Sequence, residues 1–159
     1  MMNFILMQKE DLEFLNETRN LVAEEYLHDS RKFTLDETYE WFEKNNPSYW
    51  TIWKAEERIG YFRLSNYSES NKNIYIGSDI HPSFQGKGYG YEAYLQFIPI
   101  LFNKLNLHKI TLEVLSSNLR AIHLYKKIGF VYEGTKRQEV FKNNKYVDSI
   151  IMSMLYNEI

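Results

Sequence analysis

The sequence contains no cysteine, which excludes disulfide bonds, thiolate metal sites and a covalent intermediate on a cysteine side chain. Proline and glycine are also scarce, with three and seven residues among 159, and no long linker or low-complexity tract is visible. No apolar run approaches the roughly 18 residues that cross a bilayer. Residues 1–4 lack the basic region of a secretory signal, so we expect a cytoplasmic protein.

The composition is that of one aromatic-rich globular domain, expected to span residues 1–159. Aromatic residues make up 16% of the chain, and a chain of 159 residues can bury an adequate core. The formal net charge of −2 argues against nucleic acid as a partner, and we expect a monomer or a homodimer. The histidines lack the spacing of metal ligands, so no metal is expected: His28, His81, His108 and His123.

The segment from Gln85 to Gly90 reads Gln-Gly-Lys-Gly-Tyr-Gly, with glycine at every second position. Glycine weakens the interiors of strands and helices, so these residues do not serve packing. An alternating apolar run over 74–80 precedes the segment and a helical pattern over 94–105 follows it. Free backbone N–H groups at the start of a helix bind anions, so this arrangement predicts a phosphate site. A plain flexible turn is the alternative.

Two better-known phosphate loops do not fit this segment. A dinucleotide fingerprint requires a third glycine where Tyr91 stands, and a P-loop requires Ser or Thr where Gly88 stands. The order Gln85, Gly88, Gly90 instead resembles the Gln/Arg-x-x-Gly-x-Gly/Ala signature of the GNAT superfamily of N-acetyltransferases. In that superfamily the amides of this loop hold the pyrophosphate of acetyl-CoA.

A second block supports the same resemblance. A polar residue at the start and a glycine at the end predict a helix over 119–128, and the pattern Asn118-x-x-Ala121-Ile122-x-Leu124-Tyr125-x-x-x-Gly129-Phe130 resembles the second conserved block of GNAT sequences. The tail from Tyr132 resembles the subgroup that acetylates the N-termini of ribosomal proteins and its relatives. The resemblance implies that acetyl-CoA is the co-substrate, and it implies these coenzyme contacts: Ile80, Gln85, Gly86, Lys87, Gly88, Tyr89, Gly90 and Asn118.

The fold expected from both pattern and resemblance is α+β, with a mixed, mostly antiparallel sheet of six to seven strands and about four helices. Acceptor-binding elements are expected in residues 8–50, the acetyl-CoA-binding core in 73–130, and a C-terminal hairpin in 130–156. Thr34 and Glu37 predict a capping box at the start of a helix that reaches about Asn45. The remaining expectations are a polar loop over 65–73 and a helix kinked near Gln96 by Pro99.

The resemblance implies direct transfer of acetyl from acetyl-CoA to a primary amine in a ternary complex, and the absence of cysteine favours the same route. The resemblance implies that Tyr125 is the general acid for the leaving thiolate, and a phenol with a pKa near 10 suits this role because it stays protonated at neutral pH. A buried core tyrosine is the alternative interpretation. Asn118 is expected to cap the helix, and the resemblance adds a contact with the coenzyme.

The general base has three candidates. Asp79 and His81 are two residues apart at a strand end, hence on the same side, and Glu113 lies on the following strand. A polar strand-end or surface role is the alternative for each. Deprotonating a lysine-like amine with a pKa near 10.4 at pH 7 costs about 4.6 kcal/mol, whereas an α-amino group costs only about 1 kcal/mol.

The acceptor is expected to be a protein N-terminus or a small amine such as an amino sugar. The alternatives are a polyamine or aminoglycoside acetyltransferase, or a catalytically silent module that binds acetyl-CoA. Acidic and aromatic residues gather in the first two expected helices, among them Glu24, Glu25 and Trp41. They suit a cationic amine or a sugar ring, although a solvated helix face explains the charges more simply.

Overall fold

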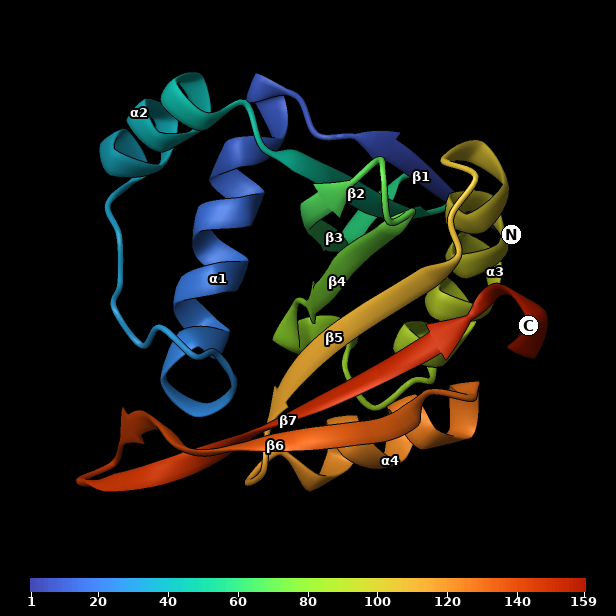
Figure 1. The fold of residues 1–159 in the computed structure, drawn as a ribbon. Coiled ribbons are helices and arrows are strands. Elements are labelled where there is room, and N and C mark those ends of the chain that lie inside the picture. The colour runs from blue at the N-terminus through green and yellow to red at the C-terminus, as the bar shows by residue number, and fades with distance from the viewer. The chain divides into compact units, whose positions relative to one another are not determined.

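A computed structural model describes residues 1–159 as seven strands and four α-helices (Figure 1). The strands form a mostly antiparallel open sheet in the order β1-β2-β3-β4-β5-β7-β6, in which β4 and β5 pair in parallel. This confirms the expected α+β architecture. The elements are β1 (Met2–Leu6), α1 (Leu12–Tyr26), α2 (Leu35–Asn45), β2 (Ser48–Lys54), β3 (Glu57–Ser68), β4 (Asn73–Ile80), α3 (Tyr89–Lys104), β5 (Lys109–Leu115), α4 (Leu119–Ile128), β6 (Val131–Lys142) and β7 (Lys145–Leu155).

The chain forms two compact units, and the single-domain expectation stays a prediction. The N-terminal unit comprises residues 1–65 and 77–93, and the C-terminal unit comprises residues 66–76 and 94–159. The strands β3 and β4 therefore contribute residues to both units. None of the helices is long and apolar enough to span a membrane.

In the N-terminal unit, β1, β2 and β3 form an antiparallel ladder, and α1 packs beside α2. Its core contains Met7, Leu12, Leu15 and Tyr61, and partly buried aromatic side chains pack against it: Phe14, Tyr39, Trp41, Phe42 and Tyr49. Thr34 caps the start of α2, because its side chain accepts a hydrogen bond of 3.1 Å from the Glu37 N–H, which is the first of the two bonds of the predicted capping box. The helix ends at Asn46, which adopts a left-handed conformation.

In the C-terminal unit, β5 pairs in parallel with β4 and antiparallel with β7, and β6 completes a long hairpin with β7. The hairpin turns at Asn143 and Asn144, whose φ angles are +52° and +61°. Asparagine tolerates such angles better than most residues, which explains why the turn forms here. The helix α4 begins and ends where the sequence predicts, with Gly129 at φ +118° as its C-cap.

The end of β3 differs from the sequence expectation, and α3 contains the expected proline. The expectation of a loop over 65–73 is wrong for residues 65–68, because β3 continues to Ser68 with exposed side chains at residues 65–67. A ladder of backbone hydrogen bonds is compatible with polar side chains when they face solvent. Pro99 lies inside the single helix α3, as expected, and the kink near Gln96 stays a prediction.

Candidate functional site

The glycine-rich loop leads directly into α3, as the sequence predicts. Gly86 and Gly88 have φ angles of +78° and +80°, which side chains other than glycine rarely adopt. The carbonyl of Gly88 accepts a bond of 3.1 Å from the Glu92 N–H and so opens the helix. A Cβ atom added at either glycine would meet no heavy atom within 4 Å, so the space beside the loop is open. Alternating left-handed residues before a helix start form a concave set of N–H donors that fits a pyrophosphate.

Hydrogen bonds to backbone carbonyl groups at the end of β4 and just after it hold this loop in place. The Gln85 amide donates a hydrogen bond of 2.9 Å to the carbonyl of Ile80. The Phe84 N–H donates to the carbonyl of His81 at 2.8 Å. Gln85 therefore shapes the loop through its side chain. Direct coenzyme contacts by Gln85 and Ile80 stay predictions.

Two lysines place positive charge near the loop. The Lys87 ammonium lies 5.7 Å from the centre of the Phe84 ring. The Lys54 ammonium lies 4.8 Å from the centre of the Tyr89 ring and 3.0 Å from the Glu92 carboxylate. Sequence reasoning missed Lys54, because only the path of β2 brings it to the start of α3. The charge of Lys87 adds to the attraction that the helix N-terminus exerts on an anion, whereas the charge of Lys54 is balanced by Glu92.

An ion pair between a buried carboxylate on β4 and a partly exposed guanidinium group on β3 lies within the N-terminal unit. The Asp79 side chain is only 4% exposed, and its carboxylate lies 3.2 Å from Nε of Arg63, an ionic contact without the alignment of a hydrogen bond. The Tyr61 hydroxyl group is buried nearby, and burial, with a smaller contribution from Asp79, raises the pKa of this tyrosine well above its usual value. Gly77 leaves room for the pair, since a Cβ atom there would lie 2.9 Å from the Arg63 guanidinium carbon.

This pairing bears on the role predicted for Asp79. A carboxylate that already neutralises a guanidinium must give up that interaction before it can take a proton from an amine. The base role of Asp79 stays a prediction, and the observed geometry gives Asp79 a structural role. Arg63 was not among the sequence candidates, because nothing in the local pattern signals its partner on the next strand.

His81 is held by different neighbours from those of Asp79. Its ring stacks on Phe14 at 5.9 Å, and its Nε2 lies 3.6 Å from a Glu17 carboxylate oxygen. Its Nδ1 accepts a hydrogen bond of 3.1 Å from the Ser83 N–H, which assigns the proton of the neutral imidazole to Nε2. Neutral His81 therefore has no free lone pair for an amine proton in this geometry, and its base role stays a prediction. Glu17, an exposed carboxylate, is a site candidate that sequence reasoning missed.

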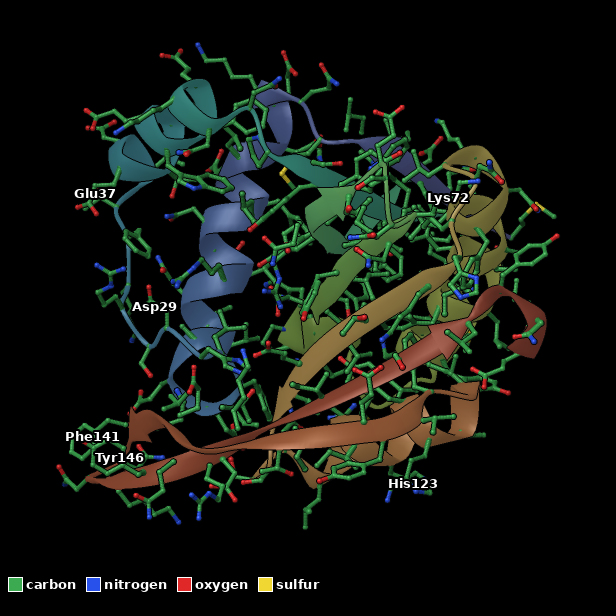
Figure 2. The ribbon with its side chains drawn as sticks, in the orientation of Figure 1. Asp29, Glu37, Lys72, His123, Phe141 and Tyr146 are labelled. Carbon is green, nitrogen blue, oxygen red and sulfur yellow. The ribbon has the colours of Figure 1, made fainter.

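The connection between α1 and α2 is tied down by cationic side chains. Arg31 makes a bidentate contact with Asp29, and this hydrogen bonding lowers the pKa of Asp29 to about 2 (Figure 2). The guanidinium groups of Arg19 and Arg31 lie 4.6 and 5.4 Å from the centre of the Phe33 ring. The Asn20 amide donates to the Phe33 carbonyl at 2.8 Å. This segment is therefore positioned by specific contacts although much of it is exposed.

In the C-terminal unit, Tyr125 lies in an aromatic cluster on α4. It is 8% exposed, and its ring meets those of Tyr94 and Phe130 at 5.6 and 5.9 Å, both edge-on. Such packing fixes the direction of the phenol, which suits a core residue and a positioned acid alike. The Asn118 side chain accepts a hydrogen bond of 3.2 Å from the Ala121 N–H, so its predicted cap role is confirmed. The acid role of Tyr125 and the coenzyme contact of Asn118 stay predictions.

Glu113 connects neighbouring strands of the same unit. Its carboxylate accepts hydrogen bonds from the Lys136 ammonium at 2.7 Å and from the Ser149 hydroxyl at 3.2 Å. The hydrogen bond with Glu113 raises the pKa of Lys136. Glu113 thus has a cross-strand structural role, and its role as a base stays a prediction.

Negative charge is concentrated in residues 8–50, which contain α1 and α2. This segment has eleven carboxylates and five lysine or arginine side chains, a net charge of −6 in a chain whose total is −2. Exposed carboxylates on α2 include Glu37 and Glu40. A surplus of one sign attracts ligands of the opposite sign and raises their rate of association.

Comparison with known proteins agrees with these features. The family model of the acetyltransferase (GNAT) domain matches residues 3–131. The spermidine N(1)-acetyltransferase of Vibrio cholerae is 31% identical over 96% of this chain and 91% of its own length. The corresponding Escherichia coli K12 enzyme is 32% identical over 64% of this chain and 55% of its own length.

Solved structures show the same likeness. The crystal structure of the Vibrio cholerae spermidine N-acetyltransferase with CoA and spermine superposes with a TM-score of 0.90 at 29% identity. That comparison covers 99% of this chain and 96% of the other. Another structure of the Vibrio enzyme is described as dodecameric, so the monomer or homodimer expected here stays a prediction. The activity is acetyl-CoA-dependent N-acetyl transfer. The chain belongs to the GNAT family of acetyltransferases.

Proposed function

We propose that this protein transfers acetyl from acetyl-CoA to a primary amine of a polyamine such as spermidine. The observation that carries the proposal is the net charge of −6 on residues 8–50, the segment expected to bind the acceptor. Relatives that act on spermidine support it independently. The acceptor favoured by sequence alone, a protein N-terminus or an amino sugar, has less support than the polyamine alternative.

Charge is the main property that separates these acceptors. Alkylamines have pKa values near 10.4, so a polyamine carries several positive charges at neutral pH, whereas an amino sugar or a peptide N-terminus carries about one. A surplus of carboxylates on α1 and α2 therefore favours the polyamine over the other two. The same surplus predicts that turnover of a polyamine is more sensitive to salt than turnover of a singly charged amine.

Transfer requires that the reacting nitrogen lose its proton first, which costs about 4.6 kcal/mol at pH 7 for a pKa of 10.4. Glu17 is suited to bind the cationic acceptor, because its side chain is 64% exposed and its carboxylate is engaged only loosely, at 3.6 Å from His81. The loop amides from Gln85 to Gly90 would hold the pyrophosphate, and Tyr125 would protonate the leaving thiolate. Acetyl-CoA supplies the activated acyl group.

The proposal is tested by measuring CoA release with spermidine, spermine, an amino sugar and an N-terminal peptide at two salt concentrations. We expect the highest kcat/KM with the polyamines, and we expect that value to fall most as salt rises. Glu17→Gln should raise KM for spermidine by up to about fivefold, as expected for one partly screened ion pair. Glu69→Gln, an exposed carboxylate of the C-terminal unit, serves as the matched control. Equal kcat/KM for all four amines would contradict the proposal.

A further inference from the structure

An ion pair joins the last residue of β2 to the first turn of α3 within the N-terminal unit. Lys54 ends β2 and is paired in register with Met2 of β1 and Glu57 of β3, so its backbone is held on both sides. Its ammonium donates to both carboxylate oxygens of Glu92, at 3.2 and 3.0 Å, and lies 4.8 Å from the centre of the Tyr89 ring. Because Tyr89 is the first residue of α3, this pair lies at the helix start that follows the glycine loop.

The carboxylate of Glu92 has two opposite effects at this place. It lies in the first turn of α3, where the dipole of the helix is positive, so its negative charge favours the helix. Side chains on a helix lean toward its N-terminus, which directs this charge toward the loop amides that are predicted to hold the pyrophosphate. An anion bound there is repelled by a carboxylate in the same turn. Glu92 alone would therefore stabilise α3 and weaken coenzyme binding.

Lys54 is placed to remove this conflict. Its contact with Glu92 involves both carboxylate oxygens, and the two side chains are only 32% and 35% exposed, so solvent and salt screen the pair less than a surface pair. The Tyr89 ring contacts the same ammonium and helps to fix its position. The negative charge of Glu92 is thus compensated where the anion is expected to bind.

The charged residues that follow Lys54 in the sequence do not take its place. Glu56 and Glu57 are exposed carboxylates in and beside the turn between β2 and β3. The next cation is Arg58, whose Nε lies 2.7 Å from the buried carboxylate of Asp11. Removing Lys54 therefore leaves a surplus of negative charge in this part of the unit.

We propose that Lys54 is a positioning residue for the coenzyme, because its charge cancels that of Glu92 at the start of α3. The pair lets Glu92 support the helix without opposing the pyrophosphate at the loop amides. The inference rests on the proposed function only in taking this loop as the pyrophosphate site, and it is independent of which amine accepts the acetyl group.

The test is calorimetry of acetyl-CoA binding without any amine, on the wild type, Lys54→Met, Glu92→Gln and the double variant. We expect Lys54→Met to raise Kd about three- to fivefold at low salt, the effect of one partly screened charge. Glu92→Gln should lower Kd, and the double variant should return close to the wild-type value. These differences should shrink as salt rises. Lys54→Arg should keep the wild-type Kd because it keeps the charge.

Thermal unfolding without ligand separates this role from a purely structural one. The double variant has lost the connection between β2 and α3, so its Tm should be lower than that of the wild type although its Kd is restored. Lys145→Met removes the same charge from an exposed position on β7 in the C-terminal unit, and it should change neither quantity. Circular dichroism establishes that each variant is folded before its Kd is interpreted.

Four results would overturn the inference. A double variant that binds as weakly as Lys54→Met would show that the connection matters and the charge does not. Differences that persist undiminished at high salt would contradict the electrostatic argument. Equal Kd values in all four proteins, with weaker binding in Gly88→Ala, would overturn the role of Lys54 and leave the loop as the coenzyme site. Equal values that include Gly88→Ala would overturn both.

Discussion

The ion pair between Arg63 and Asp79 gives a sharp prediction about stability, because its two partners differ in exposure. The Asp79 side chain is 4% exposed, whereas that of Arg63 is 36% exposed. Arg63→Met would leave a buried carboxylate without its cation, which costs about 3 kcal/mol, at the low end for buried pairs. Asp79→Asn would leave a guanidinium that still reaches water, and we expect a loss of only about 1 kcal/mol.

Urea denaturation of the wild type, both single variants and the double variant measures these losses. By thermal unfolding, a loss of about 3 kcal/mol corresponds to a fall in Tm of roughly 6–12 °C for a chain of this size. The double variant should be more stable than Arg63→Met alone, since it buries no unpaired charge. Equal losses in the two single variants, or a larger loss for Asp79→Asn, would refute the argument from exposure.

Three further predictions concern the loop, the acid and the connection after α1. Gly88→Ala should lower acetyl-CoA affinity measured by calorimetry, because its φ of +80° strains alanine by about 1–2 kcal/mol; Gly134→Ala, where a Cβ meets nothing within 4 Å, is the control. Tyr125→Phe should lower kcat by about 100-fold in the CoA-release assay, and undiminished turnover would remove it from the mechanism. Contact with Arg31 lowers the pKa of Asp29 in the folded protein to about 2, below the value of 3.8 in the unfolded chain. The ionised Asp29 therefore stabilises the fold at pH values above 3.8, and this contribution disappears as the pH falls toward 2. Asp29→Asn should therefore lose under about 1 kcal/mol at pH 7, and urea denaturation should show this gap closing by pH 2.

Local signals explain which parts of the fold could be predicted from sequence. The loop from Gln85 to Gly90 was predictable because backbone angles near φ +80° demand glycine. The bounds of α4 were predictable because Asn118 and Gly129 are ordinary cap residues. The end of β3 at Ser68 could not be predicted, because strand pairing depends on the neighbouring strand and the exposed polar side chains at this end show no strand pattern.

The missed site candidates share one physical cause. Arg63, Lys54 and Glu17 each acquire their significance from a partner on another element, at Asp79, Glu92 and His81 respectively. Contacts between residues that are 16 to 64 positions apart leave no periodic trace in a single sequence. The glycine at position 77 is the one indirect signal, and it becomes interpretable only when the Arg63 guanidinium is seen beside it.

The most direct measurement for the central claim is a competition reaction with limiting acetyl-CoA. Spermidine, an amino sugar and an N-terminal peptide are supplied together at equal concentrations, and mass spectrometry identifies which of them gains the acetyl group. The account predicts that acetylated spermidine is the main product and that CoA is released in equal amount. Acetylation mainly of the sugar or the peptide, or CoA release without any acetylated amine, would contradict it.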